Sequence, residues 1–154
     1  MAGFPTAERL AEVGPDALRP LGFSGSKARE ICSLAQRVTS GELDLEGLDQ
    51  AGDEEARRVL LGIGGVGRWS AEYTMLRGLG RLYVLPGDDV GARNNLRRRF
   101  DLAISAGYDE VAELSRSWWP YGGLVYFHLL LDALAAAGQV TPSDPPARIK
   151  RRSH

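Results

Sequence analysis

Apolar residues along this chain recur every three to four positions, the spacing that buries one face of a helix. The clearest segment is 24–40, where apolar side chains keep this spacing until Gly41 ends it. In 53–61, Asp53 stands where a helix cap is expected, and acidic residues follow it in the first turn. The expected helices, with 43–48 as a turn or a short helix, are 6–13, 16–20, 24–40, 43–48, 53–61, 69–80, 89–102, 109–115 and 121–137.

Signals for β-strands are weak. The chain has 21 leucines against 13 valines and isoleucines together, and no β-branched run lasts long. The one candidate strand, 59–63, directly continues the helical pattern of DEEARR. We therefore predict an all-α fold, a helical bundle. It forms one domain over 1–140, followed by a flexible basic tail over 141–154 that is rich in proline and polar residues.

Composition excludes several kinds of protein. With 154 residues, 44% of them hydrophobic and 25% charged, the chain can bury a core as one globular domain. The single cysteine, Cys32, excludes an intrachain disulfide framework and sites built from several cysteines, and we expect it to be a buried structural thiol. The N-terminus lacks a secretory pattern and no apolar run approaches a membrane span, which indicates a cytoplasmic protein, associated with the nucleoid if it acts on DNA.

Charge is distributed unevenly, although the net charge is only −1. Residues 91–100 contain four arginines and no acid, and 148–154 is basic, whereas the first 60 residues hold most of the acids. Local basicity suits contacts with nucleic-acid phosphates, but a solvated helix face and a frayed tail give the same pattern. Charge alone leaves both interpretations open.

The stretch 62–73, GIGGVGRWSAEY, also allows two interpretations. Its glycines match the G-x-G-x-x-G pattern of dinucleotide-binding proteins, but that fold needs several buried parallel strands, which this chain lacks. The alternative is a hairpin between two helices, in which Gly64 and Gly65 permit positive φ, Val66 fills the space between the helices and the second helix begins at Gly67. Outward-facing amides at such a helix start can bind a DNA phosphate without reading sequence. The candidate phosphate-binding residues are Gly65, Gly67 and Arg68.

A longer pattern resembles a known family. The string LLGIGGVGRWSAEYTMLRGLGRLYVLPGDDVGARNNL is similar to the helix-hairpin-helix and Gly/Pro/Asp region of the DNA glycosylase superfamily, and is most like the 3-methyladenine DNA glycosylase II group. The motif WWPY at 118–121 and the approach segment FPTAERLAEVGPDALRPLGFSGSKAREI also match, so the resemblance covers about 4–138. It implies base excision repair as the function and double-stranded DNA containing a damaged base as the partner.

The resemblance assigns the catalytic role to Asp89, which follows Pro86-Gly87-Asp88 and precedes a helix, as the family aspartate does. An ionised carboxylate there would stabilise the positive charge that develops on the sugar as the base leaves. The alternative is that Asp89 only caps the helix that follows, and both roles are compatible. Asp88 is the second candidate for the carboxylate, although an exposed neighbour or the cap itself is the simpler role for it.

Trp69 and Tyr73 are the candidate base-pocket residues. In strand-nicking members of the superfamily the position of Trp69 holds a lysine, which attacks the sugar and forms a Schiff base. Tryptophan cannot do so, and the resemblance therefore implies a monofunctional enzyme. The two rings stand four residues apart on one helix face, where they could stack on an alkylated purine. An aromatic pair at this spacing also occurs commonly in cores, and this alternative stays open.

The remaining conspicuous residues carry weaker expectations. We expect Trp118, Trp119 and Tyr121 to pack against the hairpin helices, and His128 to lie in the core, so that no metal site follows from the histidines. The arginines that we expect to lie partly against DNA and partly in water are Arg93, Arg97, Arg98 and Arg99. No cofactor is expected, although in this family the hairpin carbonyls can hold a monovalent cation.

The sequence departs from the family at four points. Gly64 replaces the proline that opens the hairpin, Gly122 replaces an arginine, and Leu130 stands where a late pocket aromatic would fall. The match also begins near the middle of the family's helical domain, so we expect no counterpart of the helices that supply the DNA-wedging side chain and one pocket wall. Three functions follow: a monofunctional glycosylase for alkylated purines, a non-catalytic DNA-binding module or glycosylase fragment, and a purely structural domain. The oligomeric state is unknown, and a dimer would cover an exposed core.

Overall fold

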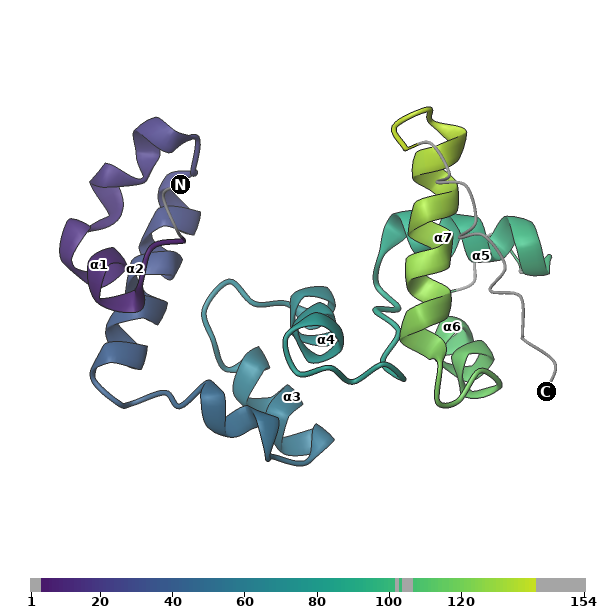
Figure 1. Ribbon diagram of the computed structural model, residues 1–154, viewed down its shortest axis with the longest axis horizontal. Helices are drawn as coiled ribbons and strands as arrows, with labels where there is room; N and C mark the ends of the chain where they lie inside the picture. The colour runs from purple at the N-terminus through teal and green to yellow at the C-terminus, as the bar shows by residue number, and fades with distance from the viewer. Residues whose placement is uncertain (1–3, 102, 104–106, 141–154) are drawn as a thin grey trace, which may run out of the picture.

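The computed structural model describes residues 4–101, 103 and 107–140 (Figure 1). Over this part of the chain the regular elements are helices and no strand occurs, which confirms the all-α prediction. The α-helices are α1 (Ala7–Val13), α2 (Gly25–Thr39), α3 (Asp53–Leu61), α4 (Arg68–Arg77), α5 (Val90–Phe100), α6 (Tyr108–Arg116) and α7 (Gly122–Ala136). Short 3₁₀ turns lie at Pro15–Ala17, Arg19–Leu21 and Glu46–Asp49. None of the described helices is long and apolar enough to cross a membrane.

Helix α4 joins the two larger hydrophobic clusters. Figure 1 shows α1 and α2 at one end of the molecule, α3 and α4 in the middle, and α5, α6 and α7 at the other end. Ala71 and Met75 of α4 lie in the cluster formed with α3, whereas Leu76 lies in the cluster formed with α5, α6 and α7. A third, smaller cluster between α1 and α2 contains Cys32, which is buried as predicted. Helix α4 is therefore packed between the two clusters.

Several helix boundaries in the structure differ from the predicted ones. Gly52, and not Asp53, is the N-cap of α3. The Asp53 carboxylate instead accepts hydrogen bonds from the Arg81 guanidinium and, at 2.7 Å, from the Tyr83 hydroxyl. The expected helix at 16–20 is two short 3₁₀ turns, because prolines near the start of each turn remove backbone donors. The predicted tail over 141–154 lies outside the described residues.

The aromatic and histidine predictions were partly wrong. His128 is exposed, because on α7 the buried side chains are Tyr126 and Leu129 and position 128 faces away from them. Trp118 packs on Phe100 of α5 at 5.3 Å between ring centroids and against the cluster that includes Leu76 of the hairpin helix α4. Trp119 contacts Tyr83 at 4.7 Å and is, like Tyr121, largely exposed.

Candidate active site where α4 meets α5 and α7

The helix-hairpin-helix is formed by α3, the turn 62–67 and α4. The amide of Val66 donates to the carbonyl of Ile63 at 3.1 Å, and Val66 packs on the same cluster as the buried Ile63, which agrees with its predicted place between the helices. Of the two glycines that permit positive φ in this turn, Gly65 uses it, at 77°, and Gly64 does not. Gly67 is the N-cap of α4 with extended backbone, rather than its first residue. No side chain caps this helix start, which leaves its first amides available to an anion.

Helix α2 lies against the hairpin glycines. A Cβ on Gly64 would overlap the Glu30 carboxylate, and one on Gly65 would lie 3.2 Å from Glu30 Cγ. A Cβ on Gly67 would meet no atom within 4 Å. The left-handed backbone explains the glycine at position 65 within the protein. At Gly64 the overlapping atoms are the end of a flexible side chain that can move away, and at Gly67 no atom interferes. Close approach of a DNA backbone, the predicted reason, therefore stays a prediction for Gly64 and Gly67.

Alanine substitutions separate these two reasons for glycine. We expect Gly65→Ala to destabilise the fold by about 1–2 kcal/mol because of its left-handed backbone. Gly67→Ala should change stability by less than about 1 kcal/mol, because its φ of −88° suits any residue, but should weaken duplex binding several-fold. Urea unfolding and fluorescence anisotropy with labelled duplex measure the two effects. If Gly67→Ala binds duplex like the wild type, the hairpin start does not contact DNA.

Asp89 is held by donors from three helices. As N-cap of α5, its Oδ1 accepts the amide of Ala92 at 2.7 Å. Its Oδ2 accepts the indole Nε1–H of Trp69, from α4, at 3.1 Å and the hydroxyl of Tyr126, from α7, at 2.9 Å. The predicted capping role is therefore real, and it uses only one of the two carboxylate oxygens.

An aromatic platform borders the carboxylate. The rings of Trp69 and Tyr73 stack at 5.2 Å with an angle of 18° between their planes. Tyr73 in turn meets Tyr126 edge-on at 6.3 Å. Trp69 is 41% exposed, which argues against a purely core role for its ring. The structure thus brings Asp89, Trp69 and Tyr73 together as the sequence pattern required.

Asp88 faces another direction. Its Oδ2 lies 3.3 Å from Arg68 Nε, and the Arg68 guanidinium also lies over the Tyr108 ring at 4.2 Å. Arg68, a candidate phosphate-binding residue, is half exposed but already paired. A phosphate at the hairpin would therefore compete with Asp88 for this guanidinium.

Glu72 is a buried residue that supports the loop before Asp89, and it was not identified from the sequence. This carboxylate is only 1% exposed, and its Oε1 accepts hydrogen bonds from Arg57 at 2.8 Å and from the Tyr108 hydroxyl at 2.6 Å. Its Oε2 accepts the amide of Gly87 at 3.2 Å, two residues before Asp89. Burial, and then the Glu72 carboxylate, raise the pKa of Tyr108, which keeps that phenol a donor. Glu72 thus links α3, α4 and α6 to the loop that presents Asp89.

The sequence profile described as HhH-GPD superfamily base excision DNA repair protein matches residues 1–121. The chain belongs to the HhH-GPD superfamily. It is 34% identical over 119 residues to DNA-3-methyladenine glycosylase 2 of Escherichia coli K12, covering 77% of this chain and 40% of that protein. It is 30% identical over 126 residues to the DNA-3-methyladenine glycosylase of Bacillus subtilis 168, covering 82% and 42%.

A solved structure agrees with these relatives. The 3-methyladenine DNA-glycosylase from Archaeoglobus fulgidus superposes with a TM-score of 0.72 at 35% identity, over 84% of this chain and 43% of that one. The resemblance to this group is therefore confirmed. The chain spans about two fifths of the length of these relatives.

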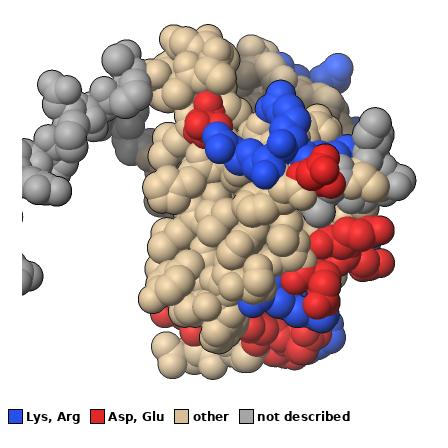
Figure 2. All heavy atoms as spheres, turned by 90° about the vertical axis from the view of Figure 1, so that its right-hand side faces the viewer, with Lys and Arg blue, Asp and Glu red and all other residues tan. Residues whose placement is uncertain are grey.

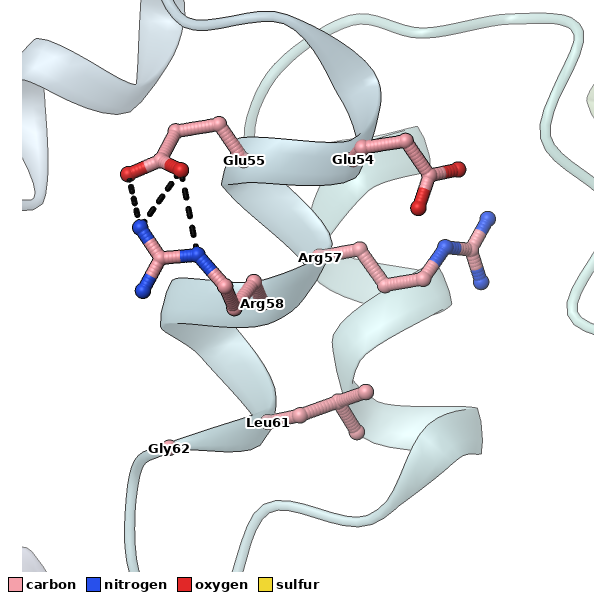
Figure 3. Close-up of a pocket in the computed structure, with 6 residues that line it drawn as sticks. All are labelled: Glu54, Glu55, Arg57, Arg58, Leu61 and Gly62. Carbon is pink, nitrogen blue, oxygen red and sulfur yellow. Dashed lines mark hydrogen bonds and ion pairs between the residues drawn. The ribbon is translucent and has the colours of Figure 1, made fainter.

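Within this HhH-GPD chain, one hollow lies away from Asp89. A hollow of about 590 Å³ on the outer side of α3 is lined by Glu54, Glu55, Arg57, Arg58, Leu61 and Gly62 (Figure 3). In it Glu55 pairs with Arg58, as the dashed lines show, and none of the predicted site residues lines it. Two acidic and two basic side chains line this hollow, and this mixture gives no chemical reason to place the candidate site there.

The arginines of α5 contribute a basic surface. Figure 2 shows the end of the molecule where α5, α6 and α7 lie. Basic side chains gather on the upper part of this face, where α5 lies, and acidic side chains lie mainly below them. Arg99 pairs with Asp132 of α7, and Arg98 donates to the Asn95 side chain. These contacts fix part of the basic surface within the protein, and contact with DNA stays a prediction for it.

Proposed function

We propose that this chain carries the chemistry of a monofunctional DNA glycosylase. It would hydrolyse the N-glycosidic bond of alkylated purines such as 3-methyladenine or 7-methylguanine in double-stranded DNA and leave an abasic site. The observation that carries the proposal is the Asp89 carboxylate bonded to the indole of a partly exposed Trp69. The names of the relatives, which are 3-methyladenine glycosylases, support the choice of substrate.

In this proposal the protein provides a fixed charge and a stacking surface. The damaged nucleotide leaves the duplex stack, and its cationic base lies against the electron-rich rings of Trp69 and Tyr73. The Asp89 carboxylate stabilises the oxocarbenium-like sugar as the base departs. Hydrogen bonds to both of its oxygens hold the carboxylate in place beside the aromatic rings.

The hairpin would hold the duplex. The uncapped start of α4, with Gly65, Gly67 and Arg68, can bind a backbone phosphate without reading sequence. A monovalent cation at the hairpin carbonyls, a dimer and a nucleoid-associated cytoplasmic location all stay predictions. The stacking platform accepts any electron-poor ring, so it suits alkylated purines as a class.

The second candidate is a DNA-binding module without catalysis. It is favoured by one observation, that Asp89 caps α5 and so has a structural role that needs no catalysis. Such a module would use only the hairpin and its phosphate contacts.

Base release and duplex binding separate the two candidates. Incubation of the chain with a duplex that contains 7-methylguanine should release free 7-methylguanine, detected by chromatography, above the spontaneous rate. The module predicts salt-sensitive duplex binding with release at the spontaneous rate. If the chain neither binds the duplex nor releases the base, both functions are contradicted.

A further inference from the structure

Tyr126 is buried in the cluster of α5, α6 and α7, yet it carries a polar group. Its side chain is 1% exposed, and its neighbours in the cluster are apolar residues such as Leu76, Leu96 and Leu129. A buried hydroxyl is unfavourable unless it is hydrogen-bonded, and phenylalanine would fill the same space without this cost. Packing therefore explains the ring of Tyr126 but not its hydroxyl.

The hydroxyl has a partner, the Asp89 carboxylate. It donates to Oδ2 at 2.9 Å, across 37 residues of sequence. Burial first, and then Asp89, raise the pKa of Tyr126 far above its ordinary value, so the phenol keeps its proton. Tyr126 is thus a permanent donor to a carboxylate, which can only accept while it is ionised.

The place of the Tyr126 hydroxyl beside Asp89 determines its possible role. The amide of Ala92 holds Oδ1 and belongs to the same helix turn as Asp89, so it fixes the cap but not the second oxygen. Oδ2 is bonded to Tyr126 on the buried side and to Trp69 on the partly exposed side. The other titratable group in this arrangement is Tyr73 of α4, which meets the Tyr126 ring edge-on, while Asp88 is turned to Arg68.

We propose that Tyr126 is a positioning residue, whose hydroxyl fixes the Asp89 carboxylate in the orientation that faces the sugar of the damaged nucleotide. This role rests on the proposed function of Asp89. It requires no contact between Tyr126 and DNA, because the residue acts through Asp89 alone.

The test compares Tyr126→Phe with Tyr83→Phe in the full chain. The control is matched, because Tyr83 also donates to a carboxylate, that of Asp53, at 2.7 Å and away from Asp89. Two readouts are needed: the carboxyl ¹³C NMR chemical shift of Asp89 in the free protein at one pH, and the single-turnover rate of 7-methylguanine release at that pH. Thermal melting and duplex affinity show whether each variant is folded and binds.

For Tyr126→Phe we expect the Asp89 carboxyl ¹³C signal to move from its wild-type position, because Oδ2 loses a donor. The maximal rate should fall roughly tenfold with duplex affinity unchanged, because orientation and not binding is lost. Tyr83→Phe should leave the signal and the rate unchanged. If the signal and the rate of a folded Tyr126→Phe equal those of the wild type, or if Tyr83→Phe changes them equally, the role is overturned. A wild type that releases no base contradicts the proposed function, while the ¹³C signal still decides whether Tyr126 holds Asp89.

Discussion

Asp89→Asn is expected to slow release of 7-methylguanine by roughly 10²–10³-fold, the loss seen when one electrostatic group is removed from a charge-stabilising site. Asparagine keeps the shape of the side chain and is as good an N-cap as aspartate, so the bond from the Ala92 amide can persist. The substitution removes the negative charge while the start of α5 stays capped. Single-turnover release under saturating protein measures the effect, and thermal melting should show a folded variant.

Asp88→Asn is the matched control for this result. Asp88 is the adjacent residue of the same type, but its carboxylate is paired with Arg68 and does not contact the aromatic platform. We expect its rate to stay within a few-fold of the wild type. Release that survives in Asp89→Asn, or an equal loss in Asp88→Asn, would contradict the assignment of Asp89.

The largest effect on stability is expected for Glu72→Ala. Removing this buried carboxylate leaves the Arg57 guanidinium, the Tyr108 hydroxyl and the Gly87 amide without their shared acceptor. Breaking a buried ion pair by removing one partner costs about 3–5 kcal/mol, and partial exposure of Arg57 favours the lower end. Urea unfolding with linear extrapolation gives the free energy of unfolding.

Glu113→Ala provides the comparison for Glu72→Ala. Glu113 also pairs with an arginine, Arg116, but both side chains are mostly exposed, and pairs of this kind contribute little. We expect no measurable change in the unfolding midpoint for this variant. A Glu72→Ala protein as stable as Glu113→Ala would show that the buried network does not support the loop before Asp89.

The elements with local signals were predictable from the sequence. Helical spacing gave the all-α fold, and the linear motif from the hairpin to Pro86 identified Asp89 together with Trp69. In this motif the spacing itself carries the information, because a helix start and a helix cap are each set by a few adjacent residues.

The long-range partners were not predictable. Tyr126 lies in an almost continuous apolar helix, where a tyrosine looks like any core residue, and its partner is 37 residues away. Glu72 and Arg57 belong to different helices, so their pairing depends on how α3 packs on α4. His128 was placed in the core for a related reason: apolar residues surround position 128 in the sequence, and only the packing of α7 shows which side is buried.

We propose that this chain breaks the base–sugar bond and leaves the strand intact, since the resemblance places Trp69 where strand-nicking members of the superfamily have a Schiff-base lysine. The most direct measurement uses an end-labelled duplex with one 7-methylguanine, divided after incubation into samples with and without alkali. We predict free 7-methylguanine, an intact strand without alkali and a single break with alkali, at yields equal to the base released. A break without alkali, or no base release above the spontaneous rate, would contradict the account.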